Sequence, residues 1–229
     1  VLKLAETCEK TNTFLVVDEC FEEFLDEPEA YSIIPFLEKL SHVFVLKAFT
    51  KIYAMAGLRL GYALCSNEDV LTKICQVRQP WSVSGLAQRA GIAALKETEY
   101  VLKTRKLIHE QREKMEAALT ELGYIVYPSQ ANYIFFMEKT LEGATDSLYD
   151  RMLKQGVLIR GCSNYPGLDA SCYRICVKTE EENREFLHKL SQCTVTKRTD
   201  IKCTDTKHTD TVYTDANPTQ APHRPEKEE

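Results

Sequence analysis

Short apolar runs alternate with segments of helical periodicity in the first half of the chain. Three such runs predict buried strands, at Thr13–Asp18, His42–Leu46 and Leu58–Leu64. One-sided apolar spacing predicts helices at Ile33–Leu40, Asn67–Cys75, Ser82–Leu95 and Glu97–Leu122. Strands separated by helices usually pair in parallel, so this half predicts an α/β fold with a parallel-rich sheet and crossover helices.

The second half has shorter strands interleaved with helices. Its strands are expected at Tyr124–Tyr127, Asn132–Phe136, Val157–Ile159 and Tyr173–Val177, and its helices at Ser147–Gln155 and Glu180–Leu190. The pattern predicts one domain over residues 1–96, followed at 97–193 by a linking helix and a small α/β domain.

The last segment, residues 194–229, differs sharply in composition. It is rich in Thr, Asp, Lys and Pro, with almost no aliphatic residues, and a Thr-Asp pair recurs every five residues from Thr199 to Asp215. Such a composition buries too little apolar surface to offset the entropy of the chain. We therefore expect a disordered low-complexity tail.

Composition narrows the class of protein. The chain has 229 residues, 44% hydrophobic, and a formal net charge of −5, values typical of a globular protein. No apolar run approaches the roughly 20 residues that a transmembrane helix needs, so no membrane association is expected. The mildly acidic balance also argues against binding to nucleic acid, which usually requires a basic patch.

The nine cysteines do not have the spacing of a disulfide framework or a zinc site. None forms a C-x-x-C pair, and most lie in apolar runs, where a free thiol behaves as a small hydrophobe. Cys172 and Cys176 resemble a metal pair, but no second pair or spaced histidines complete four ligands. The sequence thus predicts no metal site and a reduced, cytoplasmic protein.

Three charged residues stand beside the predicted strands of the first half. Asp18 closes the first buried strand, and ligands of open α/β sheets bind at such ends, although a helix-capping role would also explain it. Lys51 follows the second strand in an apolar segment, where a desolvated lysine loses its proton more easily and can attack carbonyls. Arg59, between two glycines, offers a donor fork for phosphate or carboxylate. An incidental surface loop would equally explain Lys51 and Arg59.

The segment from Thr50-Lys51 through Gly57-Leu58-Arg59-Leu60-Gly61-Tyr62 resembles the lysine segment of class I/II aminotransferases, which are fold-type I pyridoxal-phosphate enzymes. Asp18-Glu19 at a strand end and the segments around Asn132, Arg160 and Arg174 fit the same family. The resemblance covers about residues 1–190. It implies that residues 1–96 are part of a large cofactor-binding domain.

The resemblance assigns roles around pyridoxal 5'-phosphate. Lys51 would hold the cofactor as an internal aldimine and move protons at the substrate α-carbon. Asp18 would pair with the pyridine nitrogen and keep the ring an electron sink. Arg59 would bind the cofactor phosphate. Thr50 could partly replace a serine that the family often has three residues before the lysine, where this chain has Ala48.

The resemblance also assigns the substrate side of the site. Arg174 would bind the substrate α-carboxylate, Arg160 would lie near the distal group, and Asn132 would contribute beside them. The distal group is a phosphate in the histidinol-phosphate and threonine-phosphate branches. Phe21 occupies a place where typical transaminases have a tyrosine, which favours a threonine-phosphate decarboxylase, with a histidinol-phosphate-type aminotransferase as the alternative.

Two elements that the family carries before the aspartate strand are missing: a glycine-containing helix start that holds phosphate and an Asn-Pro-rich loop. We therefore expect a C-terminal fragment or a truncated product that exposes a sheet edge and binds the cofactor poorly. The resemblance implies a homodimer for a full-length chain. A truncated, non-catalytic homologue is the remaining alternative.

Overall fold

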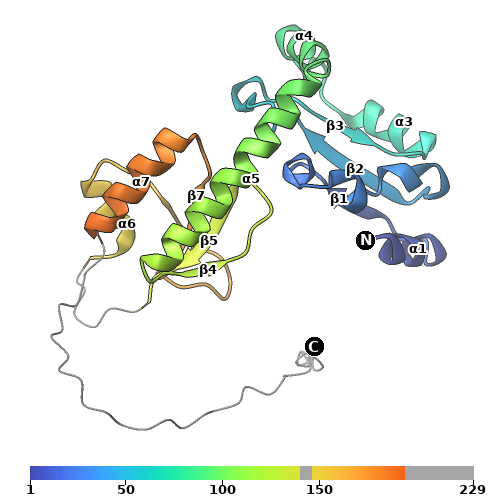
Figure 1. The fold of residues 1–229 in the computed structure, drawn as a ribbon. Coiled ribbons are helices and arrows are strands. Elements are labelled where there is room, and N and C mark those ends of the chain that lie inside the picture. Colours follow the sequence, from blue (N-terminus) through green and yellow to red (C-terminus); the bar gives the residue numbers. More distant parts are fainter. Residues whose placement is uncertain (140–145, 194–229) are drawn as a thin grey trace, which may run out of the picture. The chain divides into compact units, whose positions relative to one another are not determined.

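Two separate sheets organise the part of the chain that the computed structural model describes, residues 1–139 and 146–193 (Figure 1). The predicted disordered tail and its Thr-Asp repeat lie outside these residues. The first sheet has the order β1-β2-β3 and the second the order β4-β5-β7-β6. The prediction of a mixed α/β fold is confirmed. The predicted division between residues 96 and 97 stays a prediction.

The first sheet combines parallel and antiparallel pairing. Its strands are β1 (Leu15–Asp18), β2 (Val43–Ala48) and β3 (Gly61–Leu64). β1 and β2 are parallel, with Asp18 opposite Leu46, whereas β2 and β3 are antiparallel. The prediction of parallel pairing is therefore wrong for β3. Residues 49–60 contain only the short 3₁₀ turn η3 (Ala56–Leu58), and a parallel connection normally needs a full crossover helix.

Further helices and 3₁₀ turns precede, connect and follow the strands of this sheet. They are α1 (Leu2–Lys10), η1 (Glu22–Phe24), α2 (Pro28–Tyr31), η2 (Ile34–Lys39), α3 (Glu68–Val77) and α4 (Gly85–Ala94). Three of them, η2, α3 and α4, correspond to predicted helices with shifted boundaries. The segment predicted as a helix at Ile33–Leu40 is the 3₁₀ helix η2. Asn67 caps α3, because its Oδ1 accepts a hydrogen bond of 3.2 Å from the Val70 backbone N–H.

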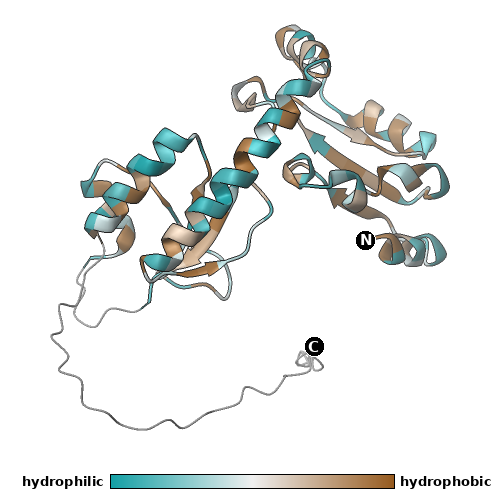
Figure 2. Cartoon of the chain, in the orientation of Figure 1, coloured by the Kyte–Doolittle hydropathy of each residue, from teal (hydrophilic) through white to brown (hydrophobic). Residues whose placement is uncertain are grey.

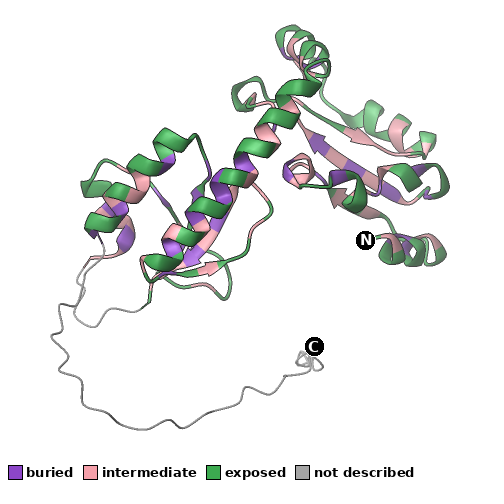
Figure 3. Cartoon of the chain, viewed as in Figure 1, coloured by how far each residue is buried: buried purple, intermediate pink, exposed green. Residues whose placement is uncertain are grey.

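Strand β2 is the most regularly buried strand of the first sheet. Every second side chain, from Val43 through Val45 to Lys47, is buried (Figure 3), and hydrophobic residues dominate the strand (Figure 2). Val43 and Val45 pack in a small core, whose other buried members are Ala5, Ile33, Leu37 and Leu40. The period of two places one charged residue, Lys47, on the same buried face.

The long helix α5 (Thr98–Glu121) leads to the second sheet, and its predicted bounds were one residue longer at each end. Its first ten residues include none that is buried, and the buried residues are Ile108, Gln111, Arg112, Met115 and Leu119 (Figure 3). Gly123 follows the C-cap residue of the helix, Leu122. This glycine has a φ of +89°, a conformation that favours a residue without a Cβ.

The second sheet is antiparallel throughout. Its strands are β4 (Ile125–Tyr127), β5 (Tyr133–Met137), β6 (Arg160–Gly161) and β7 (Cys172–Cys176), and its helices are α6 (Leu148–Lys154) and α7 (Glu180–Cys193). The strand predicted at Val157–Ile159 instead forms at Arg160–Gly161, where the chain pairs with β7. The core beneath this sheet also contains Phe24 and Ile52 from the first half of the chain.

The described residues show three further properties that bear on the class of protein. The described cysteines are free thiols. No group of three or more His, Cys, Asp or Glu side chains among residues 1–139 and 146–193 is placed to hold a metal ion. No helix in the same ranges combines the length and the apolar content that crossing a membrane requires.

Candidate active site

Thr50, Lys51 and Arg59 lie on one loop, which joins β2 to β3. The Phe49 N–H donates to the Leu60 carbonyl at 3.2 Å and closes this loop. Arg59 adopts the left-handed conformation, with φ +53°, and its guanidinium donates to the Ala56 carbonyl at 3.0 Å. A non-glycine residue in this region stores backbone strain, which is frequent at functional sites.

Lys51 and Asp18 are both exposed, which corrects the expectation that they lie in an apolar setting. In the loop, Phe49 and Ile52 turn inward and are buried, so Lys51 between them faces outward. In β1, the period of two puts Asp18 on the exposed face together with Val16. The charged pair at this end of the sheet is therefore accessible from outside the protein.

Asp18 is held in its ionised form. The Cys20 thiol and backbone N–H, the latter at 3.0 Å from Oδ1, and the positive charge of Lys51 together keep the pKa of the Asp18 carboxyl below its usual value. Burial and the neighbouring Asp18 carboxylate raise the pKa of the Cys20 thiol to about 11. The Asp18 carboxylate thus lies within electrostatic range of the Lys51 amine and remains available to a cationic or proton-donating ligand.

One cavity of about 1090 Å³ brings together four of the residues that the sequence singled out: Lys51, Asn132, Arg160 and Arg174. A neighbouring cavity of about 470 Å³ is lined by Asp18. Phe21 and Tyr133 line both cavities. Thr50 and Arg59 line neither of these two cavities, although they belong to the same loop as Lys51.

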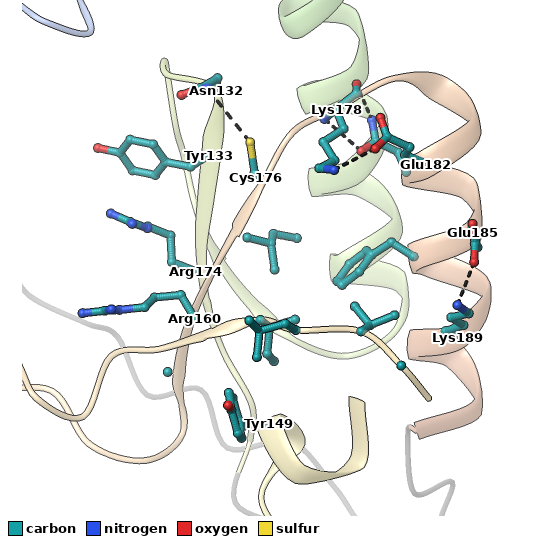
Figure 4. A pocket seen from close by; sticks show the side chains of 18 of the residues that line it. Asn132, Tyr133, Tyr149, Arg160, Arg174, Cys176, Lys178, Glu182, Glu185 and Lys189 are labelled. Atoms are coloured by element: carbon teal, nitrogen blue, oxygen red, sulfur yellow. Dashed lines mark hydrogen bonds and ion pairs between the residues drawn. The ribbon is translucent and has the colours of Figure 1, made fainter. Parts of the chain in front are cut away.

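The two arginines of the larger cavity lie side by side. Arg160 of β6 pairs directly with Arg174 of β7, and both are exposed. Figure 4 shows their side chains pointing to the same side as Tyr133. The Arg174 guanidinium lies 5.1 Å from the centre of the Tyr133 ring, and that of Arg160 lies 5.9 Å from the Tyr165 ring. The ion pairs found among the described residues include neither arginine.

Asn132 lies at the edge of this cavity, next to the start of β5. Its amide nitrogen is 4.0 Å from the Cys176 sulfur (Figure 4), and its backbone carbonyl accepts from the Val177 N–H at 2.8 Å. The backbone bond fixes the residue to the end of β7. Its side chain lines the same cavity as the two arginines.

The sequence interpretation missed a charge cluster that Lys47 forms with three glutamates, Glu19, Glu22 and Glu23. Lys47 is only 6% exposed, and its Nζ lies 2.5 Å from Glu22, 2.8 Å from Glu23 and 3.9 Å from Glu19. Glu19 in turn accepts from the Ile33 backbone N–H at 2.8 Å. The hydrogen bonds and charges of Glu22 and Glu23 raise the pKa of the Lys47 ammonium against the opposing effect of burial. The cluster ties the turn after β1 to the end of β2.

Comparison with known proteins shows the family of the chain. The family model described as aminotransferase class I and II matches residues 1–190. A threonine-phosphate decarboxylase of Salmonella typhimurium is 36% identical over 188 residues, covering 82% of this chain and 50% of that protein. A histidinol-phosphate aminotransferase of Oleidesulfovibrio alaskensis is 35% identical, with 80% and 47% covered.

Solved structures give the same result. The histidinol-phosphate aminotransferase of Clostridium acetobutylicum has a TM-score of 0.76 and 31% identity, covering 83% of this chain and 57% of that one. The L-threonine-O-3-phosphate decarboxylase of Porphyromonas gingivalis has a TM-score of 0.70. The chain spans about half the length of the curated relatives it matches. It belongs to the class I and II aminotransferase family, with the α/β architecture of the fold-type I enzymes.

Proposed function

We propose that this chain carries part of a pyridoxal-phosphate-dependent active site for a phosphorylated amino acid. The observation that supports it most is that Lys51 lines the same cavity as Arg160 and Arg174. The cavity therefore offers a nucleophilic amine and two arginines outside any described ion pair. The relatives named for threonine phosphate and histidinol phosphate support a phosphorylated amino compound as the substrate, and threonine phosphate is the amino acid of the two.

The residues present fit the cofactor. Pyridoxal 5'-phosphate, when bound, supplies an aldehyde, a ring that withdraws electrons and a phosphate dianion. The chain offers the Lys51 amine for the aldehyde, the ionised Asp18 for the ring nitrogen, and Arg59 with the Thr50 hydroxyl for the phosphate. The carboxylate and amine are electrostatically coupled. The set matches the cofactor by chemical type, and in this structure Lys51 lines the larger cavity, Asp18 the smaller one, and Thr50 and Arg59 neither.

In the proposed reaction, Lys51 has two tasks. Its amine would hold the cofactor aldehyde, and it would hold or return a proton at the substrate α-carbon. Hydrogen bonds from Cys20 keep the pKa of Asp18 low, so its carboxylate would pair with the ring nitrogen of the cofactor. The aromatic face of Phe21, whose centre is 5.1 Å from Lys51 Nζ, restricts the amine on one side.

The substrate would be held by its two anionic groups. Like charges directly opposite each other on neighbouring strands repel and cost stability, so the Arg160–Arg174 pair has a physical reason to bind anions. A guanidinium binds carboxylate or phosphate through two parallel hydrogen bonds. We assign the α-carboxylate to Arg174, with Asn132 beside it, and the distal phosphate to Arg160.

Phe21 supports decarboxylation of L-threonine O-3-phosphate as the reaction, with histidinol-phosphate-type transamination as the alternative. Both reactions use the same Lys51 chemistry and differ in which bond of the α-carbon breaks. Release of carbon dioxide from O-phospho-L-threonine would support the first. Formation of a keto acid with glutamate as the amino donor would support the second.

The arginine assignment predicts a specific loss of ligand affinity. Arg174→Ala should weaken binding of O-phospho-L-threonine about tenfold or more, because charge-assisted hydrogen bonds to the carboxylate are lost. Isothermal titration calorimetry on the full chain measures this. Arg184→Ala, on the exposed side of α7 and outside the cavity lining, is the matched control and should bind as wild type. Equal affinity in the Arg174 variant would contradict the assignment.

We also propose a homodimer. Three large apolar side chains within ten residues are almost wholly exposed: Val77, Trp81 and Leu86, at 82%, 97% and 78%. Exposed apolar surface of this kind is typical of interfaces. Since Trp81 is the single tryptophan, its fluorescence should shift to shorter wavelength as the concentration rises and the dimer forms. Sedimentation equilibrium run in parallel gives the mass, and a monomer at every concentration would refute the dimer.

A non-catalytic homologue is the competing interpretation. Ala48, in place of a phosphate-binding serine, supports it. The two interpretations differ in what Lys51 does, because only an active site requires its amine to attach the cofactor covalently.

A further inference from the structure

Four side chains form a continuous series of ring and cation contacts between the two halves of the candidate site. Lys51 Nζ lies over Phe21, at 5.1 Å from the ring centre. The Phe21 and Tyr133 rings meet edge to face, with centres 5.6 Å apart and planes at 86°. The Arg174 guanidinium then lies over Tyr133, also at 5.1 Å. The series thus joins the amine to the arginine assigned to the carboxylate.

The strand register explains why Arg174 lies on Tyr133. Arg174 pairs with Phe135, and Tyr133 is two residues earlier on β5, so Tyr133 and Arg174 share a face of the sheet as diagonal neighbours. Figure 4 shows the two side chains extended in the same direction. Within the described residues the ion pairs do not include Arg174, so the ring is its most specific neighbour. Without it, the exposed guanidinium would sample several rotamers.

Phe21 fixes the other side of the Tyr133 ring. It precedes η1, and Lys47 holds that turn to β2 through Glu22 and Glu23. An edge-to-face contact is directional, because the positive edge of one ring meets the negative face of the other. The orientation of Tyr133 is therefore set by the turn that follows Asp18, the same turn that carries the ring under Lys51.

We propose that Tyr133 is a positioning residue, which holds Arg174 toward the Lys51 amine and so sets the affinity of the site for a substrate carboxylate. The proposal rests on the proposed function for the identity of the ligand. The positioning itself is a property of the free chain and can be tested without any ligand.

The ligand-free test uses NMR of the full chain. A side chain lying over an aromatic ring experiences the ring current, so the Arg174 Hδ protons should resonate at lower frequency than those of a freely exposed arginine such as Arg184. Tyr133→Phe keeps the ring and should keep this shift, whereas Tyr133→Leu should lose it. An ordinary Arg174 shift in the wild-type chain would overturn the positioning, even if the leucine variant did not fold.

The ligand test compares O-phospho-L-threonine with O-phosphoethanolamine, which lacks the carboxylate. Tyr133→Leu should weaken binding of O-phospho-L-threonine about two- to fivefold, which is the contribution expected of a cation–π contact at an exposed site. It should leave binding of O-phosphoethanolamine unchanged. Tyr133→Phe should restore wild-type affinity, and the leucine effect should vanish in an Arg174→Ala background. Equal loss for both ligands would show a merely structural effect and overturn the proposal.

The two tests separate the proposal from the proposed function. The NMR test could show that the Arg174 shift depends on the Tyr133 ring, while the wild-type chain shows no preference for the ligand with a carboxylate. That result would confirm the contact between Tyr133 and Arg174 and refute a role for Tyr133 in substrate binding. The proposed cofactor chemistry would then be tested by the labelling of Lys51, independently of Tyr133.

Discussion

Borohydride reduction of the chain after incubation with pyridoxal 5'-phosphate is expected to fix the cofactor on the peptide that contains Lys51, and Lys51→Ala should abolish this product. The reason is chemical, because the cofactor aldehyde is captured covalently only by an amine. Lys51 is exposed, lines the larger cavity and is electrostatically coupled to Asp18. Peptide mass spectrometry after reduction measures the site, and the visible absorbance of the mixture before reduction reports the extent.

Two control variants make this result specific. Lys103→Ala removes an exposed lysine of α5, which pairs with Glu99 of the same helix, and should leave the labelling of Lys51 unchanged. Lys51→Arg keeps the positive charge but provides no amine, so it should fail like the alanine variant. Labelling spread evenly over the exposed lysines, with no preference for Lys51, would favour the non-catalytic homologue over the proposed enzyme.

Pattern and register together explain how much of this site the sequence could reveal. Buried runs located β1 and β2, and strands that run in parallel bring their carboxyl ends to one edge, so the proximity of Asp18 to Lys51 was predictable. The exposure of both residues was not, because an apolar neighbourhood in sequence does not say which side chains turn inward. The resemblance identified Arg160 and Arg174, but their direct cross-strand pairing depends on the antiparallel register of β6 and β7.

The burial of Lys47 could have been predicted from the alternation of residues along β2. Val43 and Val45 continue in phase to Lys47, so a period of two already placed the lysine on the buried face of β2. Its partners could not be found in this way. Glu19, Glu22 and Glu23 lie at least 24 residues earlier, and only the parallel pairing of β1 with β2 brings them to the lysine. Long-range pairs of this kind depend on topology rather than on local spacing.

Replacing the buried Lys47 with methionine should be the most destabilising single change in the first sheet. The variant keeps the shape of the side chain approximately but leaves three carboxylates with no cation, and breaking a buried ion pair from one side costs about 3–5 kcal/mol. Urea denaturation near neutral pH measures the free energy of unfolding. Lys114→Met, which removes an exposed pair with Glu180 at 3.4 Å, is the control and should cost about 1 kcal/mol or less.

The pH dependence tests whether the lost charge, rather than the lost volume, is responsible. Burial raises the pKa of Glu22 against the opposing effect of Lys47, so removing Lys47 should raise it further. A carboxyl with a raised folded-state pKa favours folding below its unfolded pKa and loses that contribution as the pH rises through the folded value. The cost of Lys47→Met should therefore be large near neutral pH and shrink toward about pH 4, where the glutamates take up protons. A cost that stays constant with pH would instead assign the effect to packing, and the charge cluster would no longer explain how the turn after Asp18 is held beside Lys51.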